Sequence, residues 1–157
     1  MSNKKIEALN LLLSEIEKNI PFKDKTNPNV TKSDIGWQLD HSLKVFNAVS
    51  EWTIKSNPKD YKREFNFWRT ILFPLKYIPR GKAKAPKFVL PPKIITLEDL
   101  HTQLQTAKNH IDTLKKLPKT AYFKHFIFGK LSKKQTLHFL IMHTNHHLKI
   151  VRDVLKT

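Results

Sequence analysis

The sequence predicts an all-α protein, a four-helix bundle with a long crossover between the second and third helices. Four segments repeat apolar residues at spacings of three and four, as amphipathic helices do. The 38 residues of segment 58–95 separate the second segment from the third, which is enough chain to reach the other end of a bundle. We find no convincing period-two alternation for a sheet. The length suits one domain, residues 1–157.

The first helix is expected over about residues 3–20, because an apolar stripe with helical spacing runs up to Pro21. The second is expected to begin at a capping residue, Thr31 or Ser33, with an aspartate in its first turn, and to run toward Pro58. Its apolar face contains a histidine. This face comprises Trp37, His41, Val45, Ala48 and Trp52.

The third helix is expected to open at Thr96, where Thr-Leu-Glu-Asp resembles a capping box, and to end before Pro118. The fourth follows Gly129, can use Ser132 as its cap and continues almost to the C-terminus. Its apolar face also carries histidine.

The crossover, residues 58–95, holds six of the nine prolines and a cluster of aromatic residues. We expect this cluster to pack across the bundle, with a short helix over about residues 61–72, because many exposed rings are costly. The shorter connection, residues 118–130, also contains several aromatic residues.

Composition restricts the chemistry. There is no cysteine, so disulfides, thiolate ligands and a cysteine nucleophile are excluded. Neither a signal peptide nor a spanning helix is evident, and we expect a cytoplasmic protein. The formal net charge is +16, and ten Lys and Arg against Asp60 and Glu64 place half of that excess in the crossover.

The most informative segment is His143-Thr144-Asn145-His146-His147. At 100° per residue, His143 and His147 lie about 40° apart on the helix, inside its apolar stripe, so both rings can face one ion. His146 falls on the flank of the stripe, and His138 lies opposite. His41 is a third inward histidine, from the second helix.

Three buried imidazoles are costly unless each is hydrogen-bonded or holds a metal ion. Three histidine ligands would leave coordination positions for water or substrate. The alternative is a hydrogen-bonded core cluster without metal, since eight histidines produce such spacings by chance. The zincin motif is absent, because Thr144 stands where its glutamate would be.

The stretch Gly36-Trp37-Gln38-Leu39-Asp40-His41 and the His143–His147 pair resemble the DinB-like (DinB/YfiT-like) superfamily of four-helix-bundle metalloenzymes. Residues 78–82 and 143–149 look like an uncharacterised, Bacteroidetes-type subfamily of it. The resemblance covers essentially the whole chain as helix order plus crossover. It implies that His41, His143 and His147 ligate a divalent metal, zinc or nickel.

Characterised members of that superfamily transfer low-molecular-weight thiols to electrophiles. The resemblance therefore implies a metal-dependent transferase, with thiol S-transfer favoured, or a hydrolase acting on a small anionic substrate. A glutamate often follows the first histidine of the pair in the family, and this chain has Thr144 there. A homodimer is also a possibility that the resemblance raises.

Secondary site candidates lie in the loops. His125 is a candidate for a general acid or base, and the alternative is an ordinary loop residue without a catalytic role. Trp37 is a candidate pocket wall, against a plain core role, and Arg80 and Lys82 are candidates for holding the carboxylates of a substrate.

The alternative function is a non-enzymatic basic protein that binds nucleic acid or another polyanion through segment 58–95. Lysines interleaved with rings can follow a phosphate backbone, although no nucleic-acid motif is recognisable. No membrane partner is expected.

Overall fold

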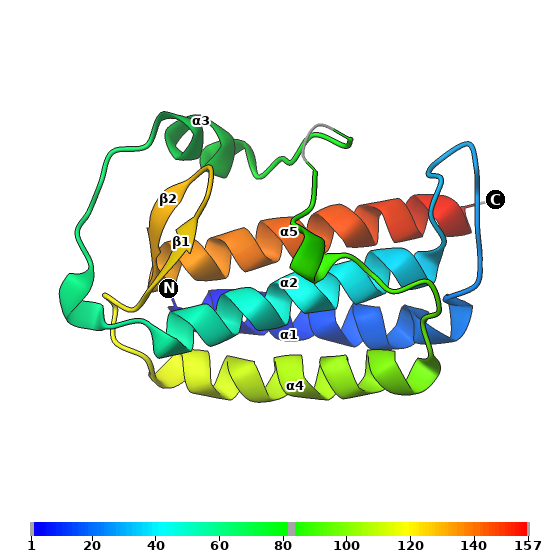
Figure 1. The fold of residues 1–157 in the computed structure, drawn as a ribbon, viewed down its shortest axis with the longest axis horizontal. Helices are drawn as coiled ribbons and strands as arrows, with labels where there is room; N and C mark the ends of the chain where they lie inside the picture. The colour runs from blue at the N-terminus through cyan, green and yellow to red at the C-terminus, as the bar shows by residue number, and fades with distance from the viewer. Residues whose placement is uncertain (1, 82–83, 157) are drawn as a thin grey trace.

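The computed structural model describes residues 2–81 and 84–156. Their main feature is a bundle of four long helices: α1 (Ser2–Asn19), α2 (Ile35–Lys55), α4 (Leu97–Lys116) and α5 (Lys133–Leu155). Figure 1 shows them side by side, with the remaining segments at the ends and along one face. The predicted helical bundle is therefore confirmed.

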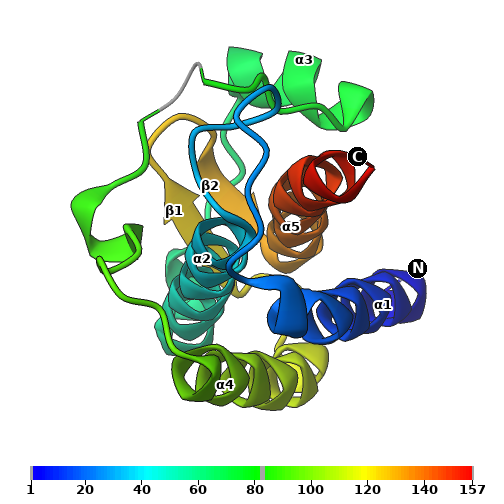
Figure 2. The same ribbon diagram turned by 90° about the vertical axis from the view of Figure 1, so that its right-hand side faces the viewer.

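The helices form a ring in which α2 and α1 each pack against both α4 and α5. Figure 2, viewed along the bundle, shows the resulting diagonal placement of α1 and α2. The core is mainly aliphatic and draws on all four helices, for example through Leu9, Leu39, Leu104 and Leu148, each almost fully buried. The contact between α2 and α5 brings the predicted histidines of both helices to one seam.

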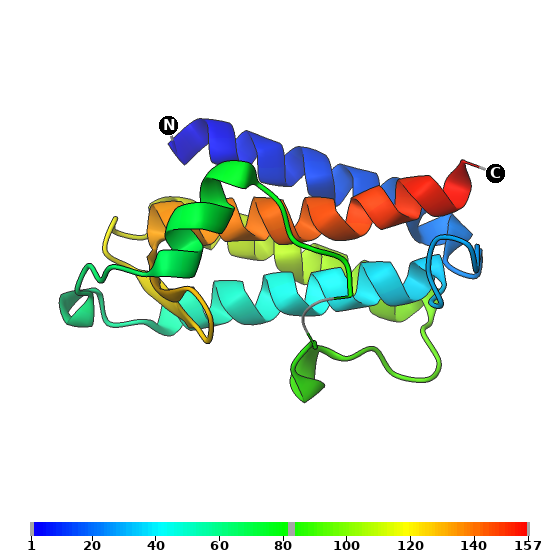
Figure 3. The same ribbon diagram turned by 90° about the horizontal axis from the view of Figure 1, so that it is seen from above.

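The crossover returns the chain from one end of the bundle to the other, as predicted. Helices α2 and α4 consequently run in the same direction (Figure 1). The crossover contains two 3-10 turns, η2 (Pro58–Asp60) and η3 (Lys87–Val89), and one helix, α3 (Phe67–Leu75). Figure 3 shows its described parts passing over α5 and reaching the outer side of α2.

Side-chain caps fix the starts of the long helices. Thr96 accepts a hydrogen bond from the amide of Asp99 at 3.0 Å, and Ser132 and Gln135 form a capping box, both as predicted. The cap of α2 is Asp34, which accepts from the amide of Trp37 at 2.7 Å. The cap predicted at Thr31 or Ser33 is therefore wrong, by three residues or by one. The carboxylate of Asp34 caps the helix because it accepts from a backbone amide of the first turn that has no partner within the helix.

The expectation of a sheet-free chain is also wrong. Strands β1 (Tyr122–His125) and β2 (Gly129–Ser132) form an antiparallel hairpin in which Phe123 faces Leu131. Two four-residue strands are not stable alone, and these are held by packing. The Phe123 ring stacks on Trp52 of α2 at 5.6 Å, and Leu131 is fully buried. The hairpin therefore depends on its packing against the bundle and not on a clear alternation of apolar and polar residues in the sequence.

Helix α3 corrects two further expectations. It begins at Phe67, capped by Asn66, and not near residue 61. The aromatic cluster does not simply pack across the bundle: Phe73 is buried, whereas Phe65, Phe67 and Trp68 are exposed. The residue that faces inward beside Phe73 is Arg69, so the helix is oriented by hydrogen bonds as well as by burial of rings.

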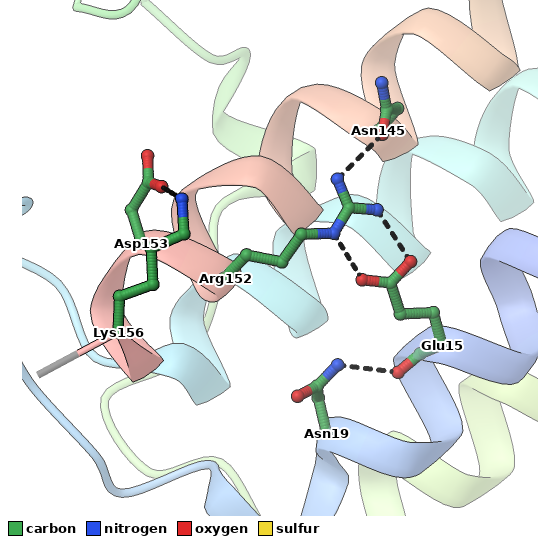
Figure 4. A network of polar contacts seen from close by, with 6 residues as sticks. All are labelled: Glu15, Asn19, Asn145, Arg152, Asp153 and Lys156. Atoms are coloured by element: carbon green, nitrogen blue, oxygen red, sulfur yellow. Dashed lines mark hydrogen bonds and ion pairs between the residues drawn. The ribbon is translucent and has the colours of Figure 1, made fainter.

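Helix α1 is fastened to the C-terminal half of α5 by a charged network (Figure 4). Arg152 donates two hydrogen bonds of 2.6 Å to the carboxylate of Glu15 and one of 3.2 Å to Asn145. A bidentate contact of this kind fixes orientation as well as position. No helix in the described part of the chain combines the length and apolarity of a membrane span.

We predict that Arg69→Leu lowers the free energy of unfolding by about 2–3 kcal/mol, because it leaves buried carbonyl groups without their donor. Arg69 donates to the carbonyl oxygens of Phe128 and Lys130 at 3.0 Å and also to that of Glu64. Urea unfolding measures the loss. Arg63→Leu, at an exposed arginine of the same segment, should change stability by no more than about 0.5 kcal/mol. Equal losses in the two variants would contradict the role of Arg69.

Candidate metal centre

The structure brings together His41 of α2 and His143 and His147 of α5, which we call the histidine triad. One ligand nitrogen from each ring lies within 4.8 Å of those from the other two. Ring centroids are 4.7 Å apart for His41–His147 and for His143–His147, and 5.3 Å apart for His41–His143. His41 and His147 are buried and His143 is half-buried. The predicted convergence of the three residues is therefore observed.

Two rings of the triad are held by hydrogen bonds from Nδ1. His147 Nδ1 lies 2.7 Å from Oε1 of Gln38, and His41 Nδ1 lies 2.9 Å from the carbonyl oxygen of Val89. Because a carbonyl oxygen only accepts, each Nδ1 must carry the proton. The Nε2 atoms of His41 and His147 are consequently unprotonated in the neutral rings, with a lone pair available to a metal.

Burial also keeps the triad neutral. The pKa of His41 is lowered, mainly by burial, against smaller opposing effects of the Val89 hydrogen bond and of Asp40. The pKa values of His143 and His147 are lowered well below the usual range by burial and then by the neighbouring histidines. At neutral pH the rings are therefore bases, ready to bind a cation without first losing protons.

Trp37 packs against the triad, and its assignment as the wall of a substrate pocket stays a prediction. Its indole stacks on the His41 ring at 5.1 Å with the planes 22° apart, and it lies 6.4 Å from the His147 ring. Phe139 flanks His143 from the other side at 5.7 Å. These rings restrict the orientations of the imidazoles and give the site apolar sides.

Residues 31–154 match the family described as "Protein of unknown function (DUF1569)". The chain belongs to the DUF1569 family. Neither a curated protein nor a solved structure matches the chain significantly. The matched range contains the whole histidine triad with Gln38 and Val89, and leaves α1 outside. The family description states no activity, so the function of this DUF1569 protein has to be inferred from its site.

Gln38 and Val89 are the site residues that the sequence did not single out. The sequence does contain a signal for Gln38, because it is a polar residue one turn before His41 on the inward face of α2. The structure shows that it is buried. Val89 had none, because any residue can offer a backbone carbonyl. Its role depends on how η3 docks against α2.

No carboxylate joins the triad among the described residues. Asp40, the neighbour of His41, is buried but accepts hydrogen bonds from Lys44 and from Nε2 of Gln103 at 2.8 Å, which draws it toward α4. Thr144 is buried in the core. The triad therefore offers three neutral nitrogens and no charged ligand.

The crossover covers α5 beside the triad. The backbone of Ile78 lies beside the ring of His146, whose pKa is lowered mainly by burial, and Arg80 forms an ion pair of 2.8 Å with Asp153. Arg80 thus lies over the C-terminal half of α5, with its guanidinium already paired. Lys82 lies outside the described residues.

His125 has a structural role in the hairpin. It is buried, and its Nδ1 accepts hydrogen bonds from the amides of Ile127 and Phe128 at 3.0 and 3.2 Å. The ring stacks against Phe126 and Phe128. It closes the turn between the strands, and its assignment as an acid or base stays a prediction.

Metal affinity should depend on Gln38. We predict that Gln38→Leu weakens zinc binding about 10- to 100-fold, because the His147 ring loses the acceptor that fixes its tautomer and orientation. Gln38→Glu keeps an acceptor there and should bind zinc at least as tightly as the wild type. Competition with a chromophoric chelator measures both affinities. Wild-type affinity in Gln38→Leu would show that the hydrogen bond does not position the ring.

His125 should make the apo protein acid-sensitive. Burial lowers its pKa from 6.5 to about 4, so the neutral form is favoured in the folded state. The resulting stabilisation is fully present above pH 6.5 and is lost as the pH falls toward 4, by about 3 kcal/mol at most. In His125→Asn the side-chain oxygen can still accept from the turn amides, but the group does not titrate.

Urea unfolding at pH 7 and pH 4, in the presence of chelator, checks this prediction. The fall in stability between the two pH values should be smaller in His125→Asn than in the wild type. His101→Asn, at an exposed histidine of α4, serves as the control and should behave as the wild type. The same fall in all three proteins would rule out a buried neutral His125.

Proposed function

We propose that this protein is a divalent-metal-dependent enzyme of the DinB-like type, with zinc or nickel held by His41, His143 and His147. The observation that carries the proposal is the convergence of three neutral imidazoles from two helices within 4.8 Å. Three histidine ligands with an open fourth position are typical of catalytic zinc. A core cluster without metal would not need the Nε2 atoms of two rings to remain free.

The residues around the triad fit a metal ion. Gln38 and Val89 accept the Nδ1 protons of His147 and His41, which is how metal-bound histidines are commonly oriented. The low pKa values of the three imidazoles favour cation binding over protonation. The all-histidine donor set suits zinc or nickel, since both bind imidazole well, and suits calcium and magnesium poorly.

The favoured reaction is transfer of a small thiol to an electrophile. When bound, a divalent cation with an open position lowers the pKa of a thiol or water molecule that reaches it. In the transfer, the sulfur forms a bond to the electrophilic carbon, the leaving group departs and the thiol proton goes to solvent. Hydrolysis of a small anionic substrate is the second reaction that such a site supports.

The contribution of the protein itself is position and environment. Trp37 and Phe139 place apolar walls beside His41 and His143, which limits the access of water. With Asp40 engaged by Lys44 and Gln103, no carboxylate of the described residues is placed to act as a base at the triad. Arg80 lies over α5 and would attract the carboxylate of a thiol such as glutathione if it exchanged Asp153 for that partner.

The basic crossover gives less support to nucleic acid as the ligand. Lys84, Lys87 and Lys93 are exposed, as a polyanion site requires. Phe88 beside Lys87 is also exposed. Exposed lysines next to one exposed ring do not distinguish nucleic acid from any other anion. The metal centre therefore remains the better foundation for a function.

Metal content tests the first part of the proposal. Untagged protein purified without chelator should contain about one zinc or nickel ion per chain by mass spectrometry, and His41→Ala and His143→Ala should contain almost none. His138→Ala is the matched control: His138 also lies on α5, but its Nε2 donates to the carbonyl of Phe73 at 2.9 Å. It should retain the metal. Equal metal content in the His138 and His143 variants would rule out the ligand assignment.

Adduct formation tests the second part. The metal-loaded protein should accelerate conjugation of glutathione, bacillithiol or mycothiol to a fluorogenic electrophile, and chelation should remove the acceleration. If the protein holds one metal ion but accelerates none of these conjugations, thiol transfer is the wrong reaction, and hydrolysis has to be tested.

A further inference from the structure

Helix α3 presents its apolar face to solvent. The exposed fractions are 57% for Phe67, 55% for Trp68, 41% for Ile71 and 64% for Leu75. At 100° per residue these four side chains fall within about 100° of one another on the helix. Figure 2 shows α3 at the edge of the molecule, outside the four-helix bundle. The arrangement is the reverse of the usual one, in which the apolar stripe faces the core.

The inner side of α3 explains this orientation. Arg69 and Phe73 face the protein, where Arg69 donates to the carbonyls of Phe128 and Lys130 and the Phe73 ring packs against Phe128 at 5.2 Å. Three strong hydrogen bonds from one guanidinium fix the rotation of the helix about its axis. The outward direction of Trp68 and Ile71 is therefore a stable feature of the fold.

The hairpin extends the same surface. Asn66, the cap of α3, donates to the carbonyl of Ile127 at 2.8 Å and so ties the hairpin turn to the start of the helix. Phe126 in that turn is 71% exposed, and Phe65, just before the helix, is 81% exposed. We call this surface the α3 face. It comprises Phe65, Phe67, Trp68, Ile71, Leu75 and Phe126.

Exposed apolar surfaces built from several large side chains usually mark an interaction site. The charges beside the α3 face indicate its nature. Lys62 and Arg63 precede it and Lys76 follows it, all exposed. Burial and the proximity of Lys134 and Lys76 lower the pKa of Lys5, so these three amines lie close enough to repel one another.

A cleft on the inner flank of α3 collects the same positive charge. It has a volume of about 480 Å³, and Lys5, Arg63, Lys134 and His138 contribute to its walls together with Phe73 of α3. None of its described lining residues is acidic. Glu64 follows Arg63 in the sequence, but it is exposed and does not line this cleft. A cationic flank of this kind attracts anionic ligands.

We propose that the α3 face docks this protein on an anionic lipid surface. Aromatic and aliphatic side chains enter the boundary between headgroups and acyl chains, while the neighbouring lysines and arginines contact acidic headgroups. Tryptophan is enriched at this boundary, and phenylalanine is common on the apolar face of helices that lie in it. The sequence analysis expects no membrane partner, and the present proposal departs from it because the exposure of the α3 side chains is visible only in the structure.

Charge also decides against a second copy of the chain as the occupant. A symmetric dimer through the α3 face would bring each patch against its own copy. The cations at the two ends of the face and in the flanking cleft would then approach those of the partner. With a net charge of +16 on each chain, that contact would be repulsive, whereas an acidic bilayer attracts the same charges.

Vesicle co-sedimentation tests the proposal. The wild-type protein should bind vesicles of phosphatidylglycerol and phosphatidylcholine at least about tenfold more tightly than vesicles of phosphatidylcholine alone, and salt should weaken the binding. Trp68→Gln combined with Ile71→Gln changes no charge and removes two exposed side chains of the α3 face. This double variant should lose about tenfold or more in affinity for the anionic vesicles.

Leu11→Gln is the matched control, because Leu11 is 71% exposed on α1, away from the α3 face. It should bind vesicles as the wild type does. Far-ultraviolet circular dichroism and metal content show that all three proteins are folded with an intact histidine triad. Failure of the wild type to bind anionic vesicles, or undiminished binding by the double variant, would overturn the proposal.

Two further results would identify a different occupant. A wild-type dimer in sedimentation velocity that the double variant converts to a monomer would show that a second copy covers the α3 face. Tight binding of a single-stranded RNA oligonucleotide that the double variant loses, without vesicle binding by the wild type, would assign the face to nucleic acid. Either result overturns lipid docking and leaves the metal centre unaffected.

Discussion

The burial of three imidazoles at one seam between α2 and α5 is the constraint on which the rest of the structure depends. Each ring carries an N–H group that would cost free energy in an apolar core without an acceptor. Gln38, from the same helix as His41, provides the acceptor for His147, so the two helices are joined by the site itself. His41 finds its acceptor in Val89, far along the chain. The crossover therefore contributes to the site and does more than connect helices.

The crossover has two sides with different roles. Its inner side holds Val89 against His41 and Arg80 against Asp153. Its outer side carries the exposed rings of α3 and most of the local positive charge. Arg69 makes the division possible, because a guanidinium with several carbonyl acceptors anchors α3 without using its apolar stripe. The proposed metal site on the inside and the proposed docking surface on the outside thus share one segment of chain.

Local patterns predicted the parts of the fold that local interactions control. The four long helices, the caps Thr96 and Ser132 and the crossover follow from spacing, capping chemistry and proline positions. Apart from the cap of α2, which is Asp34, the expectations that failed concern segments held by distant residues. The hairpin depends on Trp52 and Leu131, and the start and rotation of α3 depend on Asn66 and on Arg69 binding to the hairpin. The rings of α3 stay exposed because Arg69 occupies the inner side of the helix.

The sequence by itself determined the composition of the triad, because helical phase places His41, His143 and His147 on inward faces wherever those helices pack. Only the tertiary structure decided which helices are neighbours, and therefore that the three rings meet. It also decided the second layer of the site, since a buried glutamine becomes an acceptor only when a particular ring stands opposite it. The carbonyl of Val89 carries no sequence signal at all, because every residue has one and the path of the backbone selects which is used.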